Sequence, residues 1–259
     1  MSLAKLAAVQ MFYEFDEDRD LPVLVLSNSL GTNHSMWDLQ LAAFQQHFRV
    51  LRYDGRGHGR SETTLGPYSM EQLGRDVLAL LDALGVAKAA FCGLSLGGMV
   101  GQWLGVHAPE RLDRLVLCNT AAKIGTAEGW NERIAQVSAE GMQGIIPGVL
   151  ERWYTTEFRA ASAEVVRVTQ RMLETSNPAG YAACCAAIRD MDLRDRVREI
   201  RVPTLVVAGS MDPVTPPAEG RFLVEKIVGA EYLELDAAHL SNVETAAVFT
   251  PQVLRFLTA

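Results

Sequence analysis

Short hydrophobic runs alternate with segments of helical periodicity along most of the chain. The runs have the near-continuous apolar character of buried parallel strands, and they lie at 21–26, 89–92, 115–118 and 202–209, with a further strand-like run at 231–235. Ser69 to Gln72 form a capping box, and an apolar stripe of helical spacing then continues to Leu84, just before Gly85. This alternation predicts an α/β protein built on a parallel sheet.

The strand-type pattern stops after Cys118 and returns near Val202. Between these points the pattern is helical and rich in Ala, Glu and Arg, with expected breaks at Gly141, Gly144, Pro147 and Pro178. We therefore expect a helical cap, residues 123–199, inserted after the sixth strand of a core formed by residues 1–122 and 200–259. The cap is expected to be an insertion and not an independent domain.

The segment Gly93-Leu94-Ser95-Leu96-Gly97 carries the strongest chemical signal. It follows the apolar run 89–92 and precedes an apolar helical pattern. A G-x-S-x-G sequence in this setting predicts a nucleophile elbow, in which small residues two before and two after the serine permit a sharp, strained turn. An ordinary glycine turn is the alternative, because the chain contains 21 glycines. The strand before and the helix after favour Ser95 as a catalytic nucleophile.

A nucleophilic serine needs a base and a group that orients the base, and in this arrangement the chain order is serine, acid, histidine. His239 lies in a loop after the last strand-like run, whereas His107 falls near the end of the helix after the elbow, facing its dipole. Asp212 follows the preceding buried strand, at the same edge of a parallel sheet. We therefore predict Asp212 as the acid and His239 as the base, with Asp236 as a turn residue.

Two main-chain N–H groups complete the predicted site as an oxyanion hole. The residue after the nucleophile, Leu96, supplies one donor, and an early loop supplies the other. That loop covers residues 27–32, and Leu30 is the expected second donor. Because the donors are main-chain groups, the two leucine side chains are free to pack.

The glycine-rich loop 55–59 contains Arg56 and His58. It lacks the spacing of a phosphate-binding loop, so a structural turn is the preferred interpretation. His58 precedes the nucleophile in the chain, and we expect it to make structural hydrogen bonds.

Four stretches give the chain a resemblance to a known family: 26–32, 52–61, 91–99 and 238–244, with weaker support from 118–125, Trp130, Arg133 and 180–182. Over nearly its whole length the chain resembles the α/β-hydrolases, and within them the 3-oxoadipate enol-lactonases of bacterial aromatic catabolism. The resemblance implies a mostly parallel eight-stranded sheet flanked by helices. It also implies serine-dependent opening of 3-oxoadipate enol-lactone through an acyl-enzyme in the β-ketoadipate pathway, without a cofactor or metal.

The carboxymethyl anion of such a lactone requires a cation and a flat apolar surface near the serine. Trp130 and Arg133 lie one helical turn apart on a shared face, although a surface aromatic beside a solvated arginine is an equal alternative. Trp153, Arg152 and Arg189 are weaker candidates. The sequence leaves open which arginine binds the carboxylate, and it indicates no oligomeric state.

Length and charge agree with this interpretation. A chain of 259 residues can bury one large core, and its net charge of −7 argues against nucleic-acid binding and makes an anionic substrate depend on a local positive group. No apolar run is long enough to suggest a membrane span, and the start lacks the apolar segment of a signal peptide. The four cysteines fit a reducing compartment and show no zinc-binding spacing. A cytoplasmic protein is expected.

Rival functions remain at this stage. Another serine esterase or a carbon–carbon bond hydrolase would share every triad residue, and a non-catalytic receptor of the same fold could bind a small ligand under its cap. A haloalkane dehalogenase is excluded, because it needs a carboxylate nucleophile where Ser95 stands.

Overall fold

One eight-stranded sheet forms the centre of the protein, in the order β1-β2-β4-β3-β5-β6-β7-β8. The structure, a computed structural model, describes residues 2–16 and 20–259. The strands are β1 (Ser2–Lys5), β2 (Gln10–Phe15), β3 (Val23–Ser27), β4 (Arg49–Tyr53), β5 (Ala89–Leu94), β6 (Leu112–Cys118), β7 (Thr204–Gly209) and β8 (Glu231–Leu235). β2 pairs antiparallel with β1 and β4, and every other neighbouring pair is parallel. The predicted α/β class with a mostly parallel eight-stranded sheet is confirmed.

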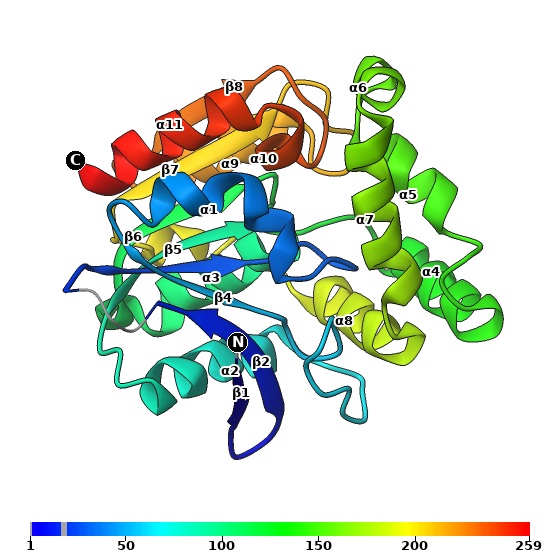
Figure 1. Cartoon of the computed structure of the whole chain (residues 1–259), viewed down its shortest axis with the longest axis horizontal. Helices are drawn as coiled ribbons and strands as arrows, with labels where there is room; N and C mark the ends of the chain where they lie inside the picture. The colour runs from blue at the N-terminus through cyan, green and yellow to red at the C-terminus, as the bar shows by residue number, and fades with distance from the viewer. Residues whose placement is uncertain (1, 17–19) are drawn as a thin grey trace.

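Helices flank this sheet (Figure 1). They are α1 (Asp38–Phe44), α2 (Met70–Ala83), α3 (Leu96–His107), α9 (Pro217–Lys226), α10 (Ser241–Glu244) and α11 (Ala246–Thr258), with short 3-10 helices at His34–Trp37, Pro109–Arg111 and Val197–Glu199. α3 packs against α2 and against strands β3, β5 and β6, whereas α1 packs against α11. None of the helices in the described part of the chain combines the length and the apolar character that a membrane span needs.

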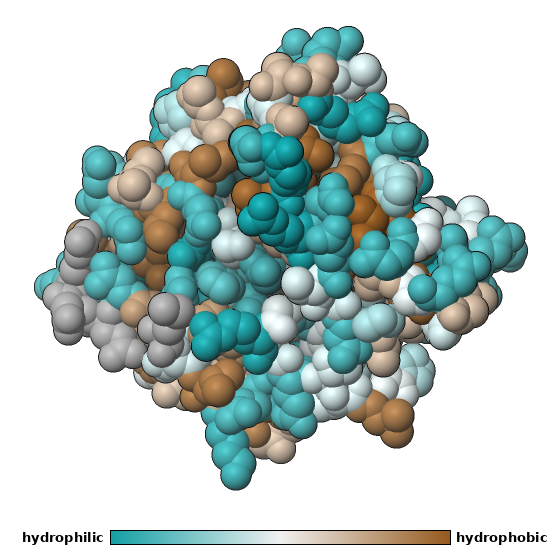
Figure 2. Space-filling model, turned by 45° about the vertical axis from the view of Figure 1, so that its right-hand side comes forward, coloured by the Kyte–Doolittle hydropathy of each residue, from teal (hydrophilic) through white to brown (hydrophobic). Residues whose placement is uncertain are grey.

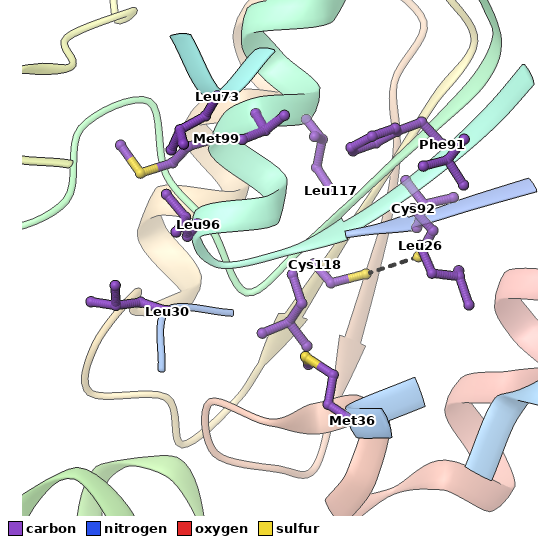
Figure 3. Close-up of a cluster of buried hydrophobic side chains, with 14 of the residues drawn as sticks. Leu26, Leu30, Met36, Leu73, Phe91, Cys92, Leu96, Met99, Leu117 and Cys118 are labelled. Atoms are coloured by element: carbon purple, nitrogen blue, oxygen red, sulfur yellow. Dashed lines mark hydrogen bonds between the residues drawn. The ribbon is translucent and has the colours of Figure 1, made fainter. Parts of the chain in front are cut away.

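Burial explains why the central strands were recognisable from the sequence. Every residue of β3, β5 and β7 is buried, as the continuous apolar runs predicted. Cys92 of β5 and Cys118 of β6 lie in this core as free thiols, with 3.9 Å between their Sγ atoms (Figure 3). The predicted start of α2 is also observed, since the Gln72 N–H donates to Ser69 Oγ at 3.1 Å.

Five α-helices lie between β6 and β7, and we call them the helical insertion (Figure 1). They are α4 (Ala127–Glu140), α5 (Ile146–Trp153), α6 (Thr156–Ala161), α7 (Ala163–Thr175) and α8 (Pro178–Asp190). Gly141 ends α4 at a φ of 71°, as expected of a break. Breaks between helices also occur at Pro147 and Pro178, since α5 starts at Ile146 and α8 at Pro178. Both prolines lie in the first turn of the new helix, where a missing N–H leaves no helical bond unmade.

Candidate active site

Ser95 occupies a strained backbone conformation between β5 and α3. Its φ of 58° and ψ of −113° are unusual for a residue with a Cβ atom. The Ser95 N–H donates to the carbonyl of Cys118 at 2.9 Å, and the Thr120 hydroxyl donates to the carbonyl of Ser95 at 2.9 Å. Hydrogen bonds to both the N–H and the carbonyl of Ser95 hold this sharp turn, which has the form of the predicted elbow.

The two glycines of the elbow are required by close backbone contacts. A Cβ atom at Gly93 would lie 2.2 Å from the carbonyl oxygen of Gly97, and one at Gly97 would lie 2.3 Å from that of Ser27. Both distances are far inside van der Waals contact, and both involve backbone that has little freedom to move. The Gly97 N–H also donates to the carbonyl of Asn28 at 3.0 Å, which joins the elbow to the early loop.

Asp212 and His239 form a buried pair. His239 Nδ1 lies 2.8 Å from Asp212 Oδ2, and both side chains are almost inaccessible to solvent. The other carboxylate oxygen, Oδ1, accepts the N–H groups of Val214 and Thr215 at 2.8 and 3.1 Å. Burial raises the pKa of Asp212, but the charge of His239 and the hydrogen bonds to the carboxylate outweigh this effect, so its pKa lies below the ordinary value. The carboxylate is therefore ionised and ready to stabilise a protonated imidazole.

Asn119, which no sequence motif marks, is a further part of this network. Its Nδ2 donates to Asp212 Oδ2 at 3.0 Å and to the carbonyl of Ala238 at 3.2 Å, and its Oδ1 accepts the hydroxyl of Ser241 at 2.5 Å. It directly follows β6, and its φ of 44° lies in the left-handed region. A polar residue directly after a buried strand was the one signal that could have found it.

The early loop and the start of α3 present two free N–H groups. Within residues 2–16 and 20–259, neither the Leu30 nor the Leu96 N–H has a hydrogen-bond acceptor. The N–H of the neighbouring Gly31 donates to His58 Nε2 at 2.8 Å, so His58 makes the structural hydrogen bond expected of it. Both leucine side chains belong to the buried hydrophobic cluster (Figure 3). The early loop and the start of α3 thus present the free main-chain N–H donors that an oxyanion hole needs.

One pocket of about 240 Å³ brings most of the predicted residues together. Its lining includes Ser95, Leu30 and His239 from the sheet and its loops. The insertion contributes Trp130, Arg133, Arg152 and Trp153. Figure 2 shows the side of the molecule on which the insertion comes forward, with hydrophobic residues scattered among hydrophilic ones.

The structure separates the three candidate arginines. Arg133 donates to the Tyr181 hydroxyl at 3.4 Å, and neither it nor Arg152 has a carboxylate partner in the described part of the chain. Burial, and then the charge of Arg133, lower the pKa of Arg152. Arg189 lies outside the pocket, where it binds the carboxylate of Asp190 at 2.7 and 2.8 Å. The pocket therefore contains two guanidinium groups, and Arg189 is not one of them.

Comparison with known proteins agrees with this geometry. A family model described as "alpha/beta hydrolase fold" matches residues 22–246, and the chain belongs to this family. It is 47% identical over 234 residues to 3-oxoadipate enol-lactonase 2 of Acinetobacter baylyi, covering 90% of this chain and 88% of the relative. It is 40% identical to 3-oxoadipate enol-lactonase 1 of the same organism, covering 88% and 85%. The crystal structure of the enol-lactonase from Burkholderia xenovorans LB400 matches all of both chains with a TM-score of 0.98 at 45% identity.

Proposed function

We propose that this protein is a serine hydrolase that opens 3-oxoadipate enol-lactone to 3-oxoadipate, a step of the β-ketoadipate pathway. The observation that carries the proposal is a pocket lined by Ser95, His239 and two guanidinium groups that form no ion pair with a carboxylate of residues 2–16 and 20–259. Such a pocket fits an ester that carries a negative charge, and the relatives of highest identity reported above are named for such a substrate.

In the proposed acylation step, Ser95 Oγ attacks the lactone carbonyl while His239 Nε2 accepts its proton. Asp212 holds the Nδ1 side of the imidazole at 2.8 Å and stabilises the imidazolium that forms. The N–H groups of Leu30 and Leu96 bind the developing oxyanion, and one such donor typically contributes about 3 kcal/mol. The ring oxygen leaves as an enolate, a better leaving group than a simple alkoxide, and becomes a ketone on protonation.

Water completes the reaction. His239 takes a proton from water, which attacks the acyl group on Ser95 and releases the second carboxylate. The tryptophans Trp130 and Trp153 supply the flat apolar surface expected for the ring, and the arginines hold the carboxylate that is already present. This chemistry uses no cofactor or metal.

We assign residues 1–122 and 200–259 to the catalytic core and residues 123–199 to a substrate-binding cap, because the residues of α4 and α5 supply the cations and tryptophans of the pocket. A cytoplasmic location and a small anionic lactone as the binding partner, with no nucleic acid and no membrane, complete the assignment. Four free, buried cysteines support a reducing compartment.

Arg133→Gln is expected to weaken the use of 3-oxoadipate enol-lactone by about tenfold to a hundredfold in kcat/KM, because a charge-assisted contact contributes about 1.5–3 kcal/mol. The measurement compares this lactone with α-angelica lactone, in which a methyl group replaces the carboxymethyl group. The neutral lactone is expected to lose much less. Arg133→Lys restores part of the difference, since an ammonium keeps the charge and loses the planar fork.

Arg189→Gln is the matched control for this experiment. It removes another arginine of the insertion, which is paired with Asp190 outside the pocket. The ratio of kcat/KM values for the two lactones should stay at the wild-type level. Equal losses on both lactones in Arg133→Gln would show that Arg133 supports the insertion and does not bind the carboxylate.

A further inference from the structure

The pocket offers recognition for two polar features of a ligand. Ser95, His239 and the free N–H of Leu30 suit an ester carbonyl, and Arg133 and Arg152 suit a carboxylate. Much of the remaining lining is apolar, and it includes Ile124, Val149, Ile188 and Val214. The lining therefore selects a carbonyl and a carboxylate that are joined by an apolar spacer.

A lactone ring has no polar atoms besides those of its ester. The apolar lining therefore has no hydrogen bond with which to distinguish a cyclic ester from a linear one. Opening of the proposed lactone leaves on Ser95 a six-carbon acyl chain that ends in a carboxylate. A linear ester of adipic acid delivers the same chain length and the same terminal charge to the same two arginines.

We propose that the pocket also hydrolyses monoesters of linear six-carbon dicarboxylic acids, and that it prefers them to neutral esters of equal acyl length. This inference rests on the proposed function. Ser95 Oγ forms a bond to the ester carbonyl carbon, the bond from that carbon to the alkoxy oxygen breaks, and the alcohol leaves with a proton from His239. Water then cleaves the acyl-enzyme to give the dicarboxylate, so each turnover consumes one water and releases one proton.

The exposed rim of the pocket provides an exit path for the alcohol released from a linear ester. Gly125, Thr126 and Gly129 line the pocket and are exposed to solvent. A small alcohol such as methanol can leave along this side while the carboxylate stays with the arginines. The leaving group of the lactone, in contrast, remains attached to the acyl chain.

The test compares monomethyl adipate with methyl hexanoate, which has the same number of acyl carbons and no charge. The wild-type protein is expected to show a kcat/KM at least about tenfold higher for monomethyl adipate, the ratio that one charge-assisted contact produces. Monomethyl succinate should be a poorer substrate, because its carboxylate lies two carbons nearer to the ester. Proton release followed at constant pH measures all three.

Arginine variants connect the preference to the pocket. In the double variant Arg133→Gln, Arg152→Gln the ratio should fall towards one, whereas Arg189→Gln should keep it. Equal kcat/KM values for the charged and neutral esters in the wild-type protein would overturn this inference. If the same protein still hydrolyses the enol-lactone, the proposed function stands. Turnover of the half-ester without turnover of the enol-lactone would reject the proposed function and keep the inference.

Glu244 joins the His239 loop to the helical insertion. Glu244 Oε2 accepts the N–H of Ala238 at 2.8 Å, and Oε1 accepts the N–H of Thr155 at 3.2 Å together with the Thr155 hydroxyl. The Leu240 N–H donates to the carbonyl of Trp153 at 3.1 Å. The residues on both sides of His239 are thus bonded, through Glu244 or directly, to the segment that carries a wall of the pocket.

We infer that Glu244 is a positioning residue for His239. Glu244→Gln replaces one acceptor oxygen by an NH2 group that faces an N–H or O–H donor, and is expected to lower kcat about tenfold while KM changes less than about twofold. Thr155→Val removes the hydroxyl that donates to Glu244 and that also caps α6 by accepting the Phe158 N–H at 3.2 Å, and it leaves the Thr155 N–H in place. It should lower kcat by a smaller factor. Ser69→Ala, which removes a helix cap remote from the pocket, should lower Tm and leave kcat unchanged. Wild-type kcat in both Glu244→Gln and Thr155→Val would overturn the inference, as would equal losses of kcat in Ser69→Ala.

Discussion

Ser95→Ala is expected to abolish nearly all hydrolysis, with kcat lower by a factor on the order of 10⁴ or more, because no acyl-enzyme can form. The fold should persist, since the Ser95 bonds to the neighbouring strand and to Thr120 use its main chain and not its hydroxyl. Steady-state kinetics on the enol-lactone, with circular dichroism and thermal unfolding as controls for folding, measure both effects. A folded variant that keeps more than about a hundredth of the wild-type kcat would show that Ser95 is not the nucleophile.

Asp212→Asn is expected to lower kcat by about 10³- to 10⁴-fold. An amide at this position can turn its NH2 group towards His239 Nδ1, which favours the tautomer that cannot accept the serine proton at Nε2. The carboxylate accepts five hydrogen bonds, from Asn119, Val214, His239 and twice from Thr215, so the substitution also leaves buried donors without a partner. Full activity in a folded Asp212→Asn protein would place the acid elsewhere.

The pH dependence of unfolding provides an independent test of the same carboxylate. The pKa of Asp212 is lowered in the folded protein, so its contribution to stability is present above the unfolded-state pKa and is lost as the pH falls through the folded-state pKa. Asp212→Asn should therefore flatten the acid side of the stability curve. Parallel curves for the two proteins, measured by denaturant unfolding at a series of pH values, would contradict the assigned pKa direction.

Local sequence predicted those parts of the site that depend on local backbone. The elbow was recognisable because Gly93 and Gly97 are required within five residues of chain. Asp212 and His239 followed from a general rule, since the carboxyl ends of neighbouring parallel strands meet at one edge of a sheet. The buried strands could be located because their apolar runs are continuous. The edge strand β1 and its neighbour β2 could not be located individually from such runs, because much of each strand is exposed or only half-buried.

The contacts that could not be predicted from the sequence join segments that lie far apart in the chain. Asn119 meets Asp212 across 93 residues and Glu244 meets Thr155 across 89, and no periodicity encodes such pairings. Helical spacing placed Trp130 and Arg133 on a shared face but did not show which face meets the pocket. The same limit explains why Arg152 and Arg189 were equal candidates, although only Arg152 lines the pocket in the part of the chain that the structure describes.

Turnover of 3-oxoadipate enol-lactone by the wild-type protein is the most direct test of the proposed function. We expect stoichiometric conversion to 3-oxoadipate, with one proton released per lactone and a kcat/KM at least about tenfold above that for α-angelica lactone. An organophosphonate that labels Ser95 should stop this turnover completely. No acceleration over the uncatalysed opening of the lactone, in a protein whose Ser95 still reacts with the phosphonate, would contradict the proposed function and indicate a serine hydrolase with another substrate.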